Sequence, residues 1–437
     1  MTLIKEKEKE KIAEGEESSK ILLEEEFSKL EAEEDPYAPP DGGWGWVVMI
    51  AAFLCCLVLD GICYIFGVFL EPMMEDFKVD NATMSAVGSV LSGVIQLVGP
   101  FVALLVNVLG MRIVCIAGAA VSCAGFFLAT FVHNVPLLML LFGVLAGSGL
   151  GLMYVPAVVS VGYYFDKRRA LATGVVCSGS GAGTFILAPI ASALLSWLGS
   201  WRGAMKVFAG LCLLCSLCGL SMRPLPKRPA KKEDKEAGEA GTAEEPKTNC
   251  MMTILEQSCS PRLLTNVPFM LLTLSNLFAT QGLYIPYMFL PSLAASKGIS
   301  ELDASFLISI VGICNTICRI LSGLLTDLPG VSALVVTFIA LGEDRLDRQC
   351  GEEENDNFLP SGVGAIAPLA MPFCESYESF VVVSAMFGAF LSAWCAVTSP
   401  AIVDMCGLDL LTSGFGTLTF VRGFAALVGK ILLRGLD

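Results

Sequence analysis

Residues 41–70 read DGGWGWVVMIAAFLCCLVLDGICYIFGVFL. Between Asp41 and Asp60 this run has no charged residue, and apolar side chains fill most of it. An α-helix rises about 1.5 Å per residue and the hydrocarbon core of a bilayer is about 30 Å thick, so about 20 apolar residues cross it. The run therefore predicts a transmembrane helix that begins near Trp44.

The composition of the whole chain agrees with a membrane protein. Over 437 residues it is 54% apolar and 16% charged, with a mean hydropathy of +0.69, which excludes an ordinary soluble protein. The net charge of −14 comes from acids near the N-terminus, in residues 223–265 and around residues 343–356, and we interpret these as solvated segments. The first 35 residues are charged and lack the apolar core of a cleavable signal peptide.

Further apolar runs predict an all-α membrane protein built from two halves. In the first half the expected helices are Trp44–Leu70, Met84–Val106, Ile113–Phe131, Val135–Tyr154 with an extension towards Phe165, Leu171–Leu198 and Ala204–Leu220. In the second half they are Val267–Leu290, Leu302–Leu325, Val331–Leu341, Phe358–Phe373, Phe380–Val403 and Leu411–Leu433. The predicted organisation is an acidic cytosolic tail (1–40), an N-terminal six-helix bundle (41–222), a polar cytosolic linker (223–265) and a C-terminal bundle (266–437).

Basic residues predict the orientation of the helices, because connections rich in Lys and Arg stay in the cytosol. Arg112, the triplet Lys167-Arg168-Arg169 and the linker fall on alternate connections. The N-terminus is therefore expected in the cytosol. The halves also share a weak repeat, since Asn107-x-x-Gly110 after the second helix corresponds to Asp327-x-x-Gly330 after the eighth.

Two motifs carry a resemblance to a known family. The first is Asp41-Gly42-Gly43-Trp44-Gly45-Trp46, and the second runs Tyr164-Phe165-Asp166-Lys167-Arg168-Arg169-Ala170-Leu171-Ala172-Thr173-Gly174. Each motif also has a plain reading, the indoles as an interfacial aromatic belt and the basic triplet as a surface anchor. Together they resemble the paired signatures of the monocarboxylate transporter family of the major facilitator superfamily. The resemblance implies two six-helix bundles, facilitative transport or symport of a small organic solute across the plasma membrane, and for some members a single-span ancillary glycoprotein.

Arg319 is the first of two charged residues inside predicted membrane helices. A charge at mid-depth costs about 2.5–3.5 kcal/mol on insertion scales, which indicates a compensating role. Its guanidinium could hold a substrate carboxylate in bidentate fashion, or it could form a structural pair. Family members that move lactate with a proton have an Asp four residues before this Arg and a Lys in the first helix. Here those positions hold Asn315 and Tyr64, so proton-coupled lactate transport does not carry over.

Asp60 is the second intramembrane charge. It precedes Tyr64 by one turn and so lies on a similar helix face. It could carry a proton, or it could form a salt bridge with Arg319 that holds the two bundles together. Five polar residues could line the cavity or could serve helix packing: Tyr64, Asn276, Gln281, Tyr284 and Tyr287.

The second half departs from a complete transporter of this kind. A polar insert at 342–357, with seven acids, interrupts the expected ninth helix, and no twelfth helix follows residue 433. The C-terminal bundle is thus expected to be incomplete, as retained introns or a faulty gene model would make it. This leaves two hypotheses: an alternating-access carrier for monocarboxylates or related small organic anions or zwitterions, or a transport-inactive truncated or mis-spliced isoform.

Other functional classes find no support in the residues. There is no nucleophile–base constellation, no phosphate-binding loop and no metal cluster, so neither an enzyme nor a cofactor or metal site is expected. The 17 cysteines mostly sit in apolar runs and are read as small packing residues. The expected partners are a small organic solute and the lipid bilayer, and no nucleic acid.

Overall fold

The protein is helical wherever its structure is described. The computed structural model describes residues 41–223, 263, 265–299, 301–327 and 370–433, and no strand occurs in these ranges. Within them seven helices are long and apolar enough to cross a membrane, and a bent pair makes eight. The predicted all-α membrane fold is confirmed. The predicted tail, almost all of the linker, the ninth helix and the insert at 342–357 lie outside the described residues.

The first half contains the six predicted spans. They are α2 (Trp44–Tyr64) followed by α3 (Phe66–Phe77), the bent pair α4 (Asn81–Leu97) and α5 (Gly99–Leu109), α6 (Met111–Ala129), the continuous segment α7 (Val135–Leu138), η1 (Met139–Ala146) and α8 (Gly147–Tyr164), α9 (Arg169–Leu198), and α10 (Trp201–Ser221). The pair α4–α5 bends by 44°. Pro100 in the first turn of α5 explains the break, because proline has no N–H to continue the helix.

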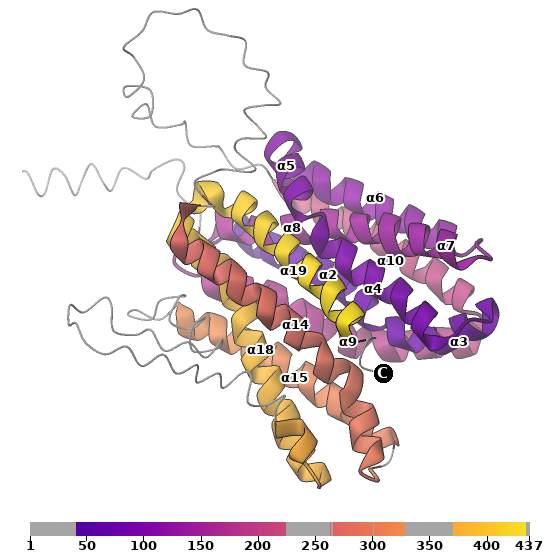
Figure 1. Ribbon diagram of the computed structural model, residues 1–437. Coiled ribbons are helices and arrows are strands. Elements are labelled where there is room, and N and C mark those ends of the chain that lie inside the picture. Colours follow the sequence, from indigo (N-terminus) through magenta and orange to yellow (C-terminus); the bar gives the residue numbers. More distant parts are fainter. Residues whose placement is uncertain (1–40, 224–262, 264, 300, 328–369, 434–437) are drawn as a thin grey trace, which may run out of the picture. The chain divides into compact units, whose positions relative to one another are not determined.

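The second half contributes four long helices to the described part of the chain. They are α14 (Val267–Ser296), α15 (Glu301–Thr326), α18 (Tyr377–Cys406) and α19 (Leu411–Leu433), with short 3₁₀ turns η2 (Met371–Phe373) and η3 (Leu408–Leu410). α15 and α18 run beside each other in Figure 1. Of the expected helix Phe358–Phe373, only the end is described, as η2, and Val331–Leu341 lies outside the described residues.

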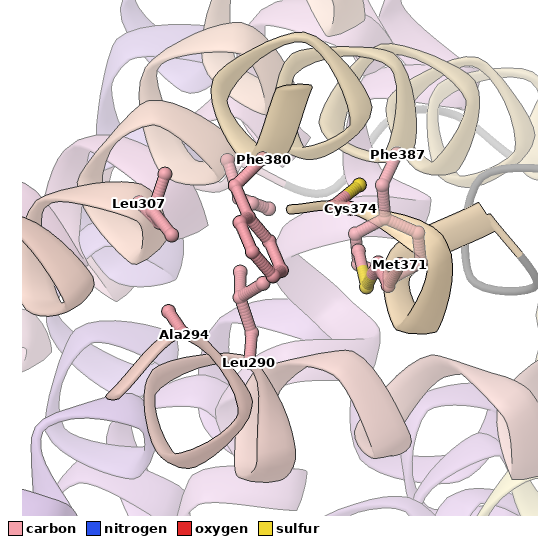
Figure 2. Close-up of a cluster of buried hydrophobic side chains, with 8 residues drawn as sticks. Leu290, Ala294, Leu307, Met371, Cys374, Phe380 and Phe387 are labelled. Atoms are coloured by element: carbon pink, nitrogen blue, oxygen red, sulfur yellow. The ribbon is translucent and has the colours of Figure 1, made fainter. Parts of the chain in front are cut away.

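A buried apolar cluster joins α14, α15 and α18 at one end (Figure 2). Phe380 is fully buried between Leu290 and Leu307 in this view. The other members are Ala294, Val311, Met371, Cys374 and Phe387. Because η2 supplies Met371, the segment that leads into α18 is fixed to the same core.

Glycines let α9 approach helices of both halves closely. A Cβ atom on Gly183 would lie 2.1 Å from the Leu57 carbonyl oxygen of α2, and one on Gly181 would lie 2.1 Å from the Thr316 hydroxyl of α15. Gly174 is similarly close to the Arg319 carbonyl oxygen, at 2.5 Å. Small residues at such contacts allow helix backbones to pack with favourable dispersion. α9 is therefore held against the first and the second half at once.

The two sequence motifs meet in space. The Asp41 N–H donates to the Tyr164 carbonyl at 3.1 Å, and its carboxylate accepts the backbone N–H groups of Asp166 and Lys167 at 2.7 and 3.0 Å. Trp46 packs edge-on against Phe165 with ring centroids 5.0 Å apart. The first motif thus fixes the connection between α8 and α9.

The other motif residues divide between surface and structure. Lys167 and Arg168 are exposed, in keeping with a surface anchor. Arg169 instead folds back, donating to the Phe165 carbonyl at 3.1 Å and pairing with Asp166 at 2.8 Å. The Trp44 indole donates to the Ser221 carbonyl at 2.8 Å. The Arg169 guanidinium and the Trp44 indole thus supply donors to carbonyl groups at the C-terminal ends of α8 and α10.

Candidate functional site

A cavity of about 80 Å³ is enclosed by helices of both halves. The first half supplies residues of α2, α4, α8 and α9, and the second half supplies residues of α14, α15, α18 and α19. The residues that line it are Cys56, Asp60, Cys63, Tyr64, Ser92, Ile95, Gln96, Tyr154, Cys177, Ser180, Thr280, Arg319, Cys395 and Arg422. Residues far apart in the sequence therefore line one small cavity.

Arg319 lines this cavity from α15 and is only 7% exposed. Its Nη1 donates to the Cys177 carbonyl and to the Ser180 hydroxyl, both on α9. Its Nε is buried and has no hydrogen-bond partner among the described residues. A buried N–H without a partner costs about 1–3 kcal/mol, so an acceptor brought into the cavity would be favoured there.

Asp60 and Tyr64 line the same cavity from successive turns of α2, as their spacing predicts. Asp60 is half-buried. No ion pair joins Asp60 to Arg319 among the ion pairs of the described chain, so the bundle-locking salt bridge considered from the sequence is not formed in this structure. Arg319 uses neutral partners on α9 instead.

Asn315 lies one turn before Arg319 and is buried, but it is not among the residues that line the cavity. Its side-chain oxygen has no hydrogen-bond partner in the described part of the chain. Asn276, for which the sequence left cavity lining and helix packing open, is also absent from the lining, and its side-chain oxygen accepts a hydrogen bond from Arg422. The side chains of Gln281, Tyr284 and Tyr287 lie outside what the structure describes.

Arg422 is the charged cavity residue that the sequence interpretation missed. It comes from α19, is 5% exposed, and donates from Nε to the Asn276 side-chain oxygen at 2.7 Å and from Nη2 to the Thr398 hydroxyl at 3.0 Å. The Asn276 amide is oriented in turn by donating to the Leu272 carbonyl at 2.7 Å. The signal was available, because Arg422 is the one charged residue between positions 411 and 427.

The chemistry of the cavity favours binding an anion. Among its described lining residues the charged ones are two guanidinium groups and one carboxylate, which leaves a net positive charge. Hydroxyl, amide and phenol groups supply further hydrogen-bonding positions from Tyr64, Ser92, Gln96 and Tyr154. Arginine suits carboxylates because its planar fork matches their two oxygens.

The described cysteines are all free thiols that are buried or half-buried. Within the same residues no group of three His, Cys, Asp or Glu side chains is placed to hold a metal ion. Four of the thiols reach the cavity, where they add small, weakly polar surface: Cys56, Cys63, Cys177 and Cys395.

Comparison with a solved structure agrees with this fold. The proton:xylose symporter XylE bound to 6-bromo-6-deoxy-D-glucose superposes with a TM-score of 0.56 at 14% identity, covering 90% of this chain and 96% of that chain. At this level of identity the likeness concerns the fold alone.

Sequence comparisons give the family. The family model of the Major Facilitator Superfamily matches residues 42–342. Monocarboxylate transporter 12 of Xenopus laevis is 30% identical over 399 residues, covering 88% of this chain and 80% of that protein. Monocarboxylate transporter 14 of Mus musculus is 29% identical over 455 residues, covering 90% and 85% of the two chains. The chain therefore belongs to the monocarboxylate transporter family of the major facilitator superfamily.

Proposed function

We propose that this membrane transporter carries monocarboxylates or related small organic anions or zwitterions by alternating access, with Arg319 as the carboxylate-binding group. One observation carries the proposal: a buried guanidinium, with its Nε unpartnered among the described residues, lines a cavity that both halves enclose. Rocking of the two halves about such a central site would expose it to each side of the membrane in turn.

The neighbouring residues have roles that follow from their positions. Tyr64 offers a phenol to a second oxygen of the substrate, and Asp60 offers a carboxylate to a cationic group or a proton. Asn315, with its unpartnered side-chain oxygen one turn from Arg319, is assigned to substrate binding in a conformation in which the halves have moved. The names of the relatives, which are monocarboxylate transporters 12 and 14, support the carboxylate.

We place the protein in the plasma membrane as a multi-pass protein with its N-terminus in the cytosol. The exposed Lys167 and Arg168 between α8 and α9 support this orientation under the positive-inside rule. A single-span ancillary glycoprotein is an expectation from the family resemblance. The domain limits predicted for the tail and the linker belong to the same proposal.

Uptake into Xenopus oocytes tests the function. A panel of radiolabelled pyruvate, 3-hydroxybutyrate, benzoate and phenylalanine covers monoanions and one zwitterion. Arg319→Gln should lower saturable uptake by more than about tenfold, and Arg319→Lys should retain part of it, because lysine keeps the charge but not the fork. The exposed Arg168→Gln serves as the matched control, with surface amounts measured by biotinylation. Unaltered saturable uptake by Arg319→Gln would refute the assignment.

The transport-inactive isoform is the alternative, and the polar insert at 342–357 is the observation that favours it. Seven acids within the insert cannot stay in hydrocarbon at acceptable cost. A variant without residues 342–357, assayed beside the unmodified chain, separates the two functions. Saturable flux through the unmodified chain rejects the alternative, and flux only after the deletion supports it.

A further inference from the structure

Arg422 has no part in the function proposed above, although it lines the same cavity as Arg319. It reaches the cavity from α19, whereas Arg319 comes from α15 and Asp60 from α2. Its side chain is 5% exposed, and its two hydrogen-bond acceptors on α14 and α18 are an amide oxygen and a hydroxyl. Both of these acceptors are neutral groups, and they fix the direction of the guanidinium.

The charges of the described cavity residues suggest what Arg422 does. Two guanidinium groups and the Asp60 carboxylate together leave a charge of +1. A substrate with a single negative charge would bring the loaded cavity to zero. Net charge is costly in a small chamber surrounded by apolar helices, so a neutral loaded state is the one that can close and reorient most easily.

We propose that Arg422 supplies the positive charge that balances Asp60, so that the carrier moves univalent organic anions without an accompanying proton. The inference rests on the proposed function and deepens it, since it names the substrate charge and the mode of coupling.

We expect pH to act on transport through protonation of Asp60, because Asp60 is the carboxylate among the described residues that line the cavity. The other titratable side chains that line the cavity are thiols and phenols. They are Cys56, Cys63 and Tyr64 on α2, Tyr154 on α8, Cys177 on α9 and Cys395 on α18. From α4 come only neutral side chains, and the charged neighbours are Arg319 on α15 and Arg422 on α19.

A charge-swap cycle tests the inference, using the panel anion that the unmodified chain carries fastest and oocytes preloaded with the same anion, so that only the loaded carrier has to reorient. Arg422→Gln should reduce its uptake about tenfold at about pH 7.5 and recover much of it at about pH 5.5, because a proton on Asp60 restores neutrality. Asp60→Asn should reduce uptake by a similar factor at both pH values. The double variant should return to within about threefold of the unmodified chain and be insensitive to pH, because it is again neutral when loaded.

Two further measurements distinguish a defect in transport from misfolding. Arg422→Lys keeps the charge and should transport without a requirement for acid, and surface biotinylation normalises every variant. The inference is overturned if the losses of uptake in the two single variants add in the double variant, or if acid does not restore uptake by Arg422→Gln. The proposed function stands in either case. An unmodified chain that carries none of the panel anions would instead overturn the proposed function, and the inference with it.

Discussion

The carboxylate of Asp327, at the end of α15, accepts the backbone N–H of Ala170, in the first turn of α9, at 3.0 Å. Its second oxygen accepts the N–H of Leu171 at 2.9 Å. The first N–H groups of a helix have no partner within it and carry partial positive charge, so a carboxylate from the other half suits them. Asn107, which the sequence repeat pairs with Asp327, instead donates its side-chain amide to the Ser413 hydroxyl near the start of α19 at 3.5 Å.

Removing the Asp327 carboxylate should loosen the two halves at the end that carries Lys167. We expect Asp327→Ala to open the cavity more often towards that side, because two helix N–H groups lose acceptors worth about 1–3 kcal/mol. Asp327→Asn, which keeps one acceptor oxygen, should be intermediate. Labelling of Cys177 by a membrane-impermeant maleimide in inside-out vesicles, read by mass spectrometry, measures the opening. Asp303→Asn, exposed near the start of α15, is the control, and equal labelling in all variants would contradict the expectation.

A single methyl group should disrupt the contact between α2 and α9. In Gly183→Ala the new Cβ would meet the Leu57 carbonyl oxygen at 2.1 Å, and this oxygen belongs to a helix backbone that cannot move aside cheaply. Overpacking of this kind costs about 1–3 kcal/mol, which should lower both the melting temperature in detergent and the amount at the cell surface. Gly210→Ala in α10 is the matched control, because a Cβ there meets nothing within 4 Å. A Gly183→Ala variant as stable as Gly210→Ala would show that α2 and α9 are less tightly packed.

Much of the helical framework could be predicted from apolar runs. The expected run Leu171–Leu198 lies inside α9, and the expected Leu411–Leu433 coincides with α19, because a bilayer demands about 20 apolar residues whatever the tertiary structure. The breaks were harder to see. The apolar pattern predicts an unbroken first helix to Leu70, but α2 ends at Tyr64 and α3 continues to Phe77, carrying Glu71 and Glu75 beyond the apolar stretch.

The candidate site could be predicted only in part, because its residues come from helices that are far apart in the sequence. Asp60, Tyr64 and Arg319 could be chosen because a charge or a family position marked each of them within its own helix. Arg422 is also a charged residue within an apolar helix, yet the acceptors of its hydrogen bonds, Asn276 and Thr398, lie 146 and 24 residues away in sequence. Whether a buried guanidinium faces a carboxylate, a neutral acceptor or an empty chamber depends on how the helices rotate, which apolar periodicity does not specify.

Acid should weaken a polar cluster at the end of α3. The Asp76 carboxylate accepts the Trp201 indole N–H at 2.8 Å and pairs with Arg202 at 2.7 Å, and Arg202 also donates to the Val132 carbonyl at 2.9 Å. Burial alone would raise the pKa of Asp76, but the hydrogen bonds from Trp201 and Arg202 outweigh it and hold the pKa below its ordinary value. The cluster therefore fastens α3 to the start of α10 and to the end of α6 through an ionised carboxylate.

The sign of the pH dependence follows from that lowered pKa. Because the folded protein binds the Asp76 proton less readily than the unfolded chain, the stabilisation is complete above the unfolded pKa of about 3.9 and is lost as the pH falls through the lower folded pKa. The side chain of Asp76 is 40% exposed, so the contribution should be below about 1 kcal/mol. We expect the melting temperature to fall between about pH 5 and pH 3 by more in the unmodified chain than in Asp76→Asn. The exposed neighbour variant Glu75→Gln should follow the unmodified chain, and identical profiles for Asp76→Asn and Glu75→Gln would mean that the ion pair adds nothing to stability.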